Sequence, residues 1–472
     1  MTANEVVFAP VRKLAEMLRT GYVSPVELTE LFLNRLESIG PNYNAVVTLT
    51  ADRALKEARR AQDEITAGRY LGPLHGIPYG IKDLFATDGI PTSWGSAMFK
   101  NQVFDFDSTV AANLKRAGAI LCAKLAMVEL AGGIKYSQAN NTFTGPGINP
   151  WGGETWAGGS SSGSGSAVAA GLVPFAIGSE TWGSIILPSA NCGLSGLRPT
   201  YGRVSRHGAM ALSWTLDKPG PMCQTADDCG LILEAISGPD RTDIAMTNRP
   251  YKYEQLDRKT FNIAVLKDAT DDIDTEIRDA FIVATEQLGK MATIEEVELP
   301  NYPYPAVTSA IFMSESASVL SNLAASQRSD ELTAPEMRHG LYARSASLST
   351  DYLRAMRIRK MIAIEMDQLL SKYDALVAPS RPAFAYPLKG DWHSIRSKDV
   401  VGAMGNAIGL PAISVPSGFS KDGLPAGILF IGRAYEENRI LAVASAYQSM
   451  TGWHNQHPNV PGSDINSEVP HD

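Results

Sequence analysis

The chain has 472 residues, 44% of them apolar, and a net charge of −8 from 42 basic and 50 acidic residues. This length and apolar content suffice for a large buried core. The scattered charges of both signs argue against nucleic acid or an anionic membrane as the main partner. No run of 18 apolar residues occurs, so we expect no transmembrane helix.

Cysteine and histidine usage points to a reducing compartment and away from metal. The four cysteines are spread along the chain without a CxxC pair, which favours free thiols and a cytoplasmic location. The seven histidines show neither an HExxH spacing nor a Cys/His cluster. We therefore expect no metal site and no cofactor.

Residues 1–70 are predicted to be a helical region. Apolar residues recur at helical spacing over 11–18 and 25–39, and Ser24 followed by proline is typical of a helix N-terminus. Residues 51–67 are predicted to form a third, charge-rich helix.

Helical and strand-like stretches then alternate along the chain. Four helix-then-strand pairs are predicted at 108–117 with 119–123, 166–171 with 173–177, 275–289 with 293–298, and 352–371 with 375–378. Further strands are expected at 77–85, 263–266, 412–415 and 427–431, and a closing helix at 438–450. This alternation predicts an α/β sheet covered by helices on both faces.

Residues 158–166 are all glycine or serine. Such a run is typical of a flexible linker, but here it leads directly into apolar residues 167–177. Small residues let backbone approach backbone and let N–H groups point at a ligand, and the serines add hydroxyls. The pattern indicates a serine-nucleophile site. A nucleotide-binding loop is disfavoured, because no strand precedes the run and no GK[ST] motif occurs in it.

Ser184 is the candidate nucleophile. It lies where a turn enters a short apolar stretch that Pro188 is expected to end, beside N–H groups of residues 181–184 that a helix start leaves unpaired. Such N–H groups are suited to stabilise an oxyanion. The alternative is that Ser184 only caps the helix.

Lys82 is the candidate base, because the apolar segment 77–81 is expected to bury it. Burial disfavours the ammonium ion and would lower the pKa of this lysine from ~10.4 toward about 7. An ion pair with Asp83 or a surface position would instead keep Lys82 charged. A Ser-His-Asp triad also stays open, although a GxSxG elbow is absent. The relay between Lys82 and Ser184 would be one hydroxyl of the run, with four candidates: Ser160, Ser161, Ser162 and Ser164.

Residues 158–205, GGSSSGSGSAVAAGLVPFAIGSETWGSIILPSANCGLSGLRPTYGRVS, resemble the signature of the amidase signature family. Supporting stretches such as GPLHGIPYGIKDLF at 72–85 and GLPAISVPSGFSKDGLPAGILFIGR at 409–433 extend the resemblance along nearly the whole chain. The resemblance implies a large mixed, mainly parallel twisted β-sheet with helices on both faces. We expect a single domain over 1–455, with a catalytic core at 72–240, a substrate-pocket region at 250–400 and a disordered polar tail at 456–472.

The family's Ser–cis-Ser–Lys set, carried over by position, falls on Ser184 as nucleophile, Ser160 after a cis peptide bond as bridge, and Lys82 as base. The resemblance implies that the relay activates Ser184 to attack a carbonyl and form an acyl-enzyme. It also implies an oxyanion hole of four backbone N–H groups, from Thr181, Trp182, Gly183 and Ser184, and supporting roles for Ser161 and Gly159.

This chain departs from the family's usual pattern around the nucleophile. Asp-Thr-Gly-Gly is replaced by a sequence with Trp182 in its third position, and the usual arginine two residues after the nucleophile is Ile186. The acidic residue Glu180 then needs another partner, and Arg198 and Arg203 are the candidates. Ser162 also replaces a usual glycine.

Trp182, Trp214 and Met210 indicate an apolar substrate pocket that tolerates aromatic groups, although bulky residues of this kind also form plain core.

The leading functional prediction is a hydrolase that cleaves carboxamide C–N bonds, with aryl amides, esters and carbamates as further substrates. The alternative is the glutamine-hydrolysing component of a tRNA-dependent amidotransferase, and a third hypothesis is a non-catalytic binding protein. Under the leading prediction we expect a small-molecule amide or carbamate as partner, a monomer or homodimer, and neither nucleic acid nor membrane.

Overall fold

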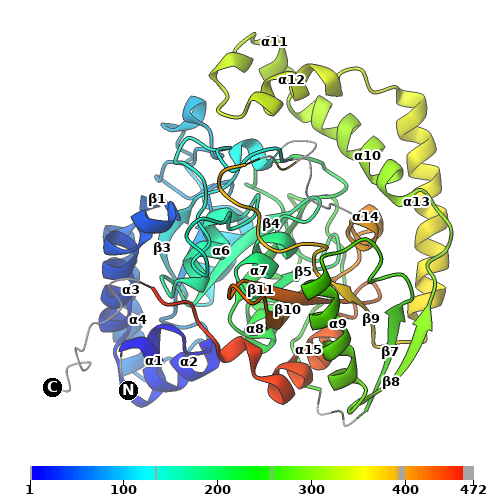
Figure 1. The fold of residues 1–472 in the computed structure, drawn as a ribbon. Coiled ribbons are helices and arrows are strands. Elements are labelled where there is room, and N and C mark those ends of the chain that lie inside the picture. The colour runs from blue at the N-terminus through cyan, green and yellow to red at the C-terminus, as the bar shows by residue number, and fades with distance from the viewer. Residues whose placement is uncertain are drawn as a thin grey trace.

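The computed structural model describes residues 3–460 except 133–135, 257, 259, 391 and 393–398. Its strands are β1 (Val46–Leu49), β2 (Pro78–Lys82), β3 (Ile120–Leu125), β4 (Phe175–Glu180), β5 (Ser195–Arg198), β6 (Lys218–Cys223), β7 (Phe261–Leu266), β8 (Ala292–Val297), β9 (Ala375–Pro379), β10 (Ala412–Phe419) and β11 (Pro425–Ile431). They form one eleven-stranded sheet in the order β1-β3-β2-β4-β6-β5-β10-β11-β9-β7-β8, with helices around it (Figure 1). The large mixed α/β sheet is confirmed.

The parallel pairs of the sheet are fewer than expected. Among the described strands, β3–β2, β2–β4, β9–β7 and β7–β8 pair in parallel, whereas the other six neighbouring pairs are antiparallel. "Mainly parallel" is therefore corrected to mixed. The physical reason lies in strands such as β10 and β11, which a short turn joins into a hairpin, and a hairpin is necessarily antiparallel.

The N-terminal region is helical, as predicted. Its helices are α1 (Ala3–Val7), α2 (Val11–Thr20), α3 (Pro25–Ser38) and α4 (Ala51–Thr66). The start of α3 is a capping box, because the Ser24 hydroxyl accepts the Glu27 N–H while the Glu27 carboxylate accepts the Ser24 N–H. Helices α3 and α4 pack on each other and on β3.

The central strands contribute side chains to two hydrophobic cores, one on each face of the sheet. The helices concerned are α5 (Thr109–Arg116), α6 (Ser162–Ala169), α7 (Ile186–Asn191), α8 (Ala226–Ile236), α9 (Thr275–Leu288) and α15 (Glu437–Thr451). Along β4, Phe175 and Ile177 join the core that contains α8 and α15, whereas Ala176 joins the core that contains α6. This alternation is the two-residue period of a strand buried on both faces.

The Gly/Ser run is not a loop that precedes a helix at 166, as expected, but itself forms most of α6. Glycine and serine have weak helix propensity, so tertiary burial decides this segment. Every residue of α6 is buried, and the hydroxyls of Ser164 and Ser166 donate to the carbonyls of Ile177 and Ile148. Small side chains therefore let α6 lie directly against its neighbours.

The helices between residues 304 and 407, a stretch that also contains β9 of the sheet, add a layer at the top and right of Figure 1. Its helices are α10 (Tyr304–Val319), α11 (Ser321–Ala325), α12 (Pro335–Arg344), α13 (Ser349–Leu370) and α14 (Val400–Ala407). Helix α10 packs on α12, α13 and α14. No helix in the described part of the chain is long and apolar enough to span a membrane.

Residues 456–460, the first part of the predicted disordered tail, are packed against the rest of the chain. The His457 ring stacks on Phe8 with 4.0 Å between centroids, and Val460 is buried. These contacts anchor residues 456–460 to the N-terminal helices. The remainder of the predicted tail, 461–472, lies outside the described residues.

Candidate active site

Lys82 is the last residue of β2 and its side chain is fully buried. Its Nζ lies 2.7 Å from Ser160 Oγ and 3.0 Å from Ser179 Oγ. Burial lowers the pKa of Lys82 to about 7, while the charges of Asp217 and Glu180 oppose the shift. The alternative ion pair with the adjacent aspartate is not formed.

Asp83 instead pairs with another buried lysine. Its carboxylate lies 3.0 Å from Lys124 Nζ and also accepts hydrogen bonds from the N–H and hydroxyl of Ser93. Asp83 is therefore not the partner of Lys82, which contacts the hydroxyls of Ser160 and Ser179 instead.

Ser160 lies just before α6, and the Gly159–Ser160 peptide bond is cis, as the resemblance implies. A Cβ atom at Gly159 would come within 2.6 Å of Val128 Cγ2, so only glycine fits this contact. The next residue, Ser161, places its Oγ 3.3 Å from the Ser179 N–H nitrogen and 3.2 Å from the Ser179 carbonyl oxygen. Ser161 therefore ties the start of α6 to the strand residue that Lys82 contacts.

Ser179 is a site residue that sequence reasoning missed. It lies in β4, and the only available signal was its position five residues before Ser184.

Ser184 lies in the turn between β4 and α7, where the expected short helix begins. The capping role that would explain this serine belongs to Glu180, whose Oε2 accepts the N–H groups of Ile185 and Ile186 at 2.9 and 3.0 Å. The backbone N–H groups of Trp182, Gly183 and Ser184 have no acceptor among the described residues. Gly183 takes a φ of 87°, a conformation that side chains disfavour. The turn thus presents free donors beside the Ser184 hydroxyl.

Arg198 is the partner that Glu180 needs in the absence of an arginine at 186. The two side chains are buried and lie 2.8 Å apart, and Asn406 Nδ2 donates to the same Glu180 oxygen at 3.0 Å. Although burial by itself would raise it, the Arg198 guanidinium and the Ile186 N–H lower the pKa of Glu180 to about 2. The other candidate, Arg203, pairs with Glu437.

Tyr136 is a further site residue that sequence reasoning missed. Burial raises its pKa to about 12, and the interactions of its hydroxyl with Ser184 and Ser160 oppose that shift. Its ring packs edge-on against Trp156, with 5.0 Å between centroids. No sequence signal distinguished this tyrosine from the other tyrosines of the chain.

A cavity of about 580 Å³ opens onto Ser184. Trp182 and Tyr136 form part of its wall, and Trp182 Nε1 donates to Asp399 at 2.6 Å. The expected pocket region contributes residues from several elements to the same wall, among them Leu266, Phe312, Pro379 and Tyr386. No group of three His, Cys, Asp or Glu residues that could hold a metal ion occurs in the described part of the chain.

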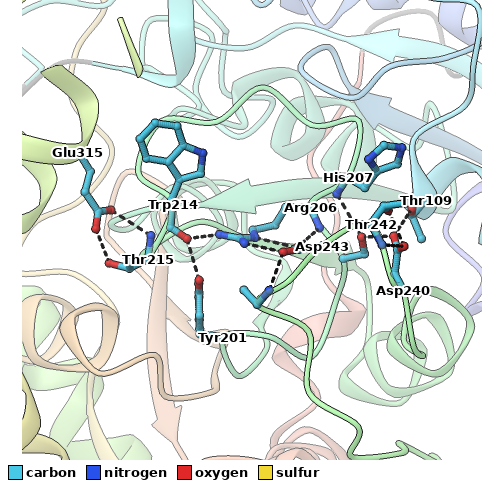
Figure 2. Close-up of polar contacts among 12 residues, drawn as sticks. Thr109, Tyr201, Arg206, His207, Trp214, Thr215, Asp240, Thr242, Asp243 and Glu315 are labelled. Carbon is cyan, nitrogen blue, oxygen red and sulfur yellow. Dashed lines mark hydrogen bonds and ion pairs between the residues drawn. The ribbon is translucent and has the colours of Figure 1, made fainter. Parts of the chain in front are cut away.

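Met210 and Trp214 line a different cavity, of about 180 Å³, and Trp214 is 48% exposed. Figure 2 shows Arg206, which lines this cavity, between Asp243 and the backbone carbonyl of Trp214. Of the three residues expected to share a substrate pocket, only Trp182 lies beside Ser184. The two cavities share Thr181 in their walls.

A family model described as Amidase matches residues 27–441. The chain belongs to the amidase family. The resemblance to the amidase signature family is thereby confirmed, and this amidase is a hydrolase acting on C–N bonds.

Its sequence relatives are components of amidotransferases. The amidase is 37% identical to a Glutamyl-tRNA(Gln) amidotransferase subunit of Thioalkalivibrio sulfidiphilus, over 95% of this chain and 98% of the relative. It is 38% identical to the corresponding subunit of Marinobacter nauticus, over 95% and 99%.

Solved structures resemble it across nearly the whole chain. The peptide amidase of Stenotrophomonas maltophilia superposes with a TM-score of 0.86 at 29% identity, over 96% of this chain and 99% of that chain. The same Glutamyl-tRNA(Gln) amidotransferase subunit from Thermotoga maritima gives 0.78 at 29% identity, over 98% of each.

These relatives overturn our expectation about partners. Their names describe subunits of an assembly that acts on a tRNA, so the expectation of a small molecule alone, of no nucleic acid and of a monomer or homodimer was wrong. The error has a physical reason. A net charge of −8 disfavours a broad basic surface on this chain, but it says nothing about nucleic acid held by another protein of the assembly. The relatives support the amidotransferase alternative better than a free amidase.

Proposed function

We propose that this amidase cleaves a carboxamide through an acyl-enzyme on Ser184, with Lys82 as base and Ser160 as bridge. The observation that carries the proposal is a buried lysine, its pKa lowered to about 7, with its nitrogen 2.7 Å from the Ser160 hydroxyl. In its uncharged form, Lys82 takes the Ser160 proton as Ser160 takes the Ser184 proton. The Ser184 oxygen then bonds to the amide carbon.

The N–H groups of Trp182, Gly183 and Ser184 would bind the oxyanion that forms at the former carbonyl oxygen of the amide. Thr181 is the first residue of the same segment. When the carbonyl re-forms, the C–N bond breaks and the relay returns a proton to the leaving nitrogen. Water then attacks the ester carbon, the same relay takes its proton, and the acid leaves as Ser184 is regenerated.

We propose further that the chain supplies this activity as the glutamine-hydrolysing component of a tRNA-dependent amidotransferase. Likeness over 95% of the chain to subunits of such enzymes supports the proposal. Glutamine would be cleaved to glutamate and ammonia, and partner subunits would use the ammonia. Four free, buried cysteines support a cytoplasmic location.

One observation favours a second candidate, the hydrolysis of larger amides, with esters or carbamates as further substrates. The cavity at Ser184 is bounded by aromatic side chains such as Trp182, Phe312 and Tyr386, which suit an apolar acyl or amine group. The likeness to a peptide amidase supports the same candidate.

Two measurements test these proposals. Mass spectrometry after treatment with a fluorophosphonate should find the label on Ser184, and label on another serine would refute the assignment. Hydrolysis of glutamine and of an anilide is then compared for the chain alone and with amidotransferase partner subunits. Glutaminase activity that needs the partners supports the first role, and anilide turnover by the chain alone supports the second.

A further inference from the structure

Asp217 lies just before β6, at the edge of the smaller cavity and outside the proposed triad. One carboxylate oxygen accepts the N–H groups of Leu212 and Ser213 at 2.8 and 3.0 Å. The other accepts the Thr181 hydroxyl at 2.6 Å. The Asp217 carboxylate therefore stabilises the turn formed by residues 212–217 and also binds Thr181, the residue that follows β4.

The register of the sheet brings these two residues together. β4 and β6 are antiparallel, with Glu180 opposite Lys218, so Thr181 and Asp217 are the next positions beyond the end of the ladder. The Thr181 hydroxyl bond continues the pairing where the backbone hydrogen bonds stop. Thr181 is buried, and its side chain is held in one direction by this contact.

The segment from Thr181 to Ser184 is consequently held at both ends by carboxylates. Glu180 binds the N–H groups that follow Ser184, and Asp217 binds the side chain of Thr181. Between these two anchors lie the N–H groups that have no acceptor in the described part of the chain. Donors fixed in advance stabilise a developing oxyanion without having to reorganise during the reaction.

Asp217 also contributes charge. It and Glu180 are the two carboxylates whose fields favour the ammonium form of Lys82, against burial. Glu180 is neutralised by Arg198, whereas Asp217 faces Lys218, whose pKa burial lowers to about 7. Asp217 also acts on Arg206, which is paired with Asp243, and Arg359 acts on Lys218. Burial raises the pKa of Asp217, and the three hydrogen-bond donors at its oxygens oppose that shift and favour the carboxylate form.

We propose that Asp217 is a positioning residue that fixes the oxyanion segment through Thr181 and places a negative charge toward Lys82. The inference rests on the proposed Ser184 mechanism. Asp217 lines the smaller cavity and not the cavity at Ser184, so its role in the reaction would act through Thr181.

The test measures the rate at which a fluorophosphonate labels Ser184, as a function of pH, in Asp217→Asn and Thr181→Val. Asparagine keeps the shape but removes the charge, so Lys82 loses its protonated form more easily. We expect the acid limb of the labelling rate to move to lower pH by about one unit, with a roughly tenfold lower plateau. Thr181→Val removes only the hydroxyl, so the plateau should fall while the acid limb stays.

Two further variants serve as controls. Asp243→Asn removes another carboxylate from the same cavity wall without touching the 181–184 segment, and it should leave the acid limb in place. Thr181→Ser keeps the donor and should restore the plateau that valine loses. If Asp217→Asn does not fold, judged by its thermal transition, the valine and serine pair still decides the positioning role.

The outcomes separate this inference from the proposed function. If the wild-type chain takes no label at Ser184, the proposed mechanism fails. If the wild type is labelled and Asp217→Asn shows an unchanged acid limb, or Thr181→Val an unchanged plateau, Asp217 does not have the role proposed for it.

Discussion

Glu180 and Arg198 form a buried ion pair, with 2.8 Å between the carboxylate Oε1 and the guanidinium Nη1. Arg198 thus replaces, as the partner of Glu180, the arginine that the family usually has at the position of Ile186. Because Glu180 also accepts the N–H groups of Ile185 and Ile186, the pair fixes the start of α7 directly after Ser184.

Arg198→Met should destabilise the fold by about 3–5 kcal/mol, because it leaves a buried carboxylate without its counter-ion. The lowered pKa of Glu180, about 2, gives stability that is present above its ordinary value and is lost as pH falls toward 2. In the variant this contribution is missing, so the stability difference from the wild type should be largest near neutral pH and should shrink as pH falls below the ordinary value of 4.5, as urea unfolding between pH 3 and 8 would show. Arg203→Met, which breaks the buried pair with Glu437, is the matched control. It should lower stability yet keep Ser184 labelling, and equal labelling in both variants would contradict the role given to Arg198.

Lys82→Met should abolish turnover and fluorophosphonate labelling, with a loss of at least about a thousandfold, because within the described residues Lys82 is the amine that hydrogen-bonds to Ser160. Turnover of an amide at pH 7.5 is the measurement. Lys115→Met, at a half-exposed position on α5, should retain wild-type activity. Retained activity in Lys82→Met would refute the assigned base.

The pH dependence follows from the pKa of Lys82, about 7 in the fold against an ordinary 10.5. Activity needs the uncharged amine, so kcat/KM should rise through pH 7 and level off above it. Between these two values the unfolded chain binds the extra proton, so this lysine makes stability increase with pH. Lys82→Met should therefore raise Tm most near pH 7 and progressively less toward pH 10, as calorimetry would show. A gain that grew with pH would have the wrong sign.

Tyr136→Phe should lower kcat about tenfold with little change in Tm, because the ring contact with Trp156 is kept while the hydroxyl that reaches Ser160 and Ser184 is lost. Steady-state kinetics and thermal unfolding measure the two quantities. Tyr70→Phe, on a partly exposed tyrosine far from Ser184 in the chain, is the control. Unchanged kcat in Tyr136→Phe would show that its hydroxyl has no part in the reaction.

Trp182→Ala should widen the cavity at Ser184 and raise kcat/KM for anilides with bulky acyl groups about tenfold relative to a small amide. Trp182→Phe removes the donor to Asp399 but keeps an aromatic ring, so it should change this preference far less. Comparison of a series of acyl anilides gives the ratio. Equal preferences in the alanine and phenylalanine variants would show that the size of Trp182 does not select substrate.

Many helices and strands of the fold could be predicted from local sequence patterns. Helix α3 was predictable because Ser24, proline and Glu27 make a start signal within a few residues of each other. The strand at Lys82 was predictable because an apolar run around a single lysine indicates burial. β5 and β6 were missed, since their Gly, Pro and Lys residues are poor strand formers that tertiary pairing overrides.

The sequence by itself determined which residues we propose for the catalytic positions, because Lys82, Ser160 and Ser184 lie in stretches with family-specific spacing. Only the tertiary structure decided which side chains surround them: Arg198 at Glu180, Asp217 at Thr181, and Tyr136 between the two serines. It also separated Met210 and Trp214 from the cavity at Ser184. The physical reason is that such contacts join residues far apart along the chain, where sheet register and packing set the distance and no local period records it.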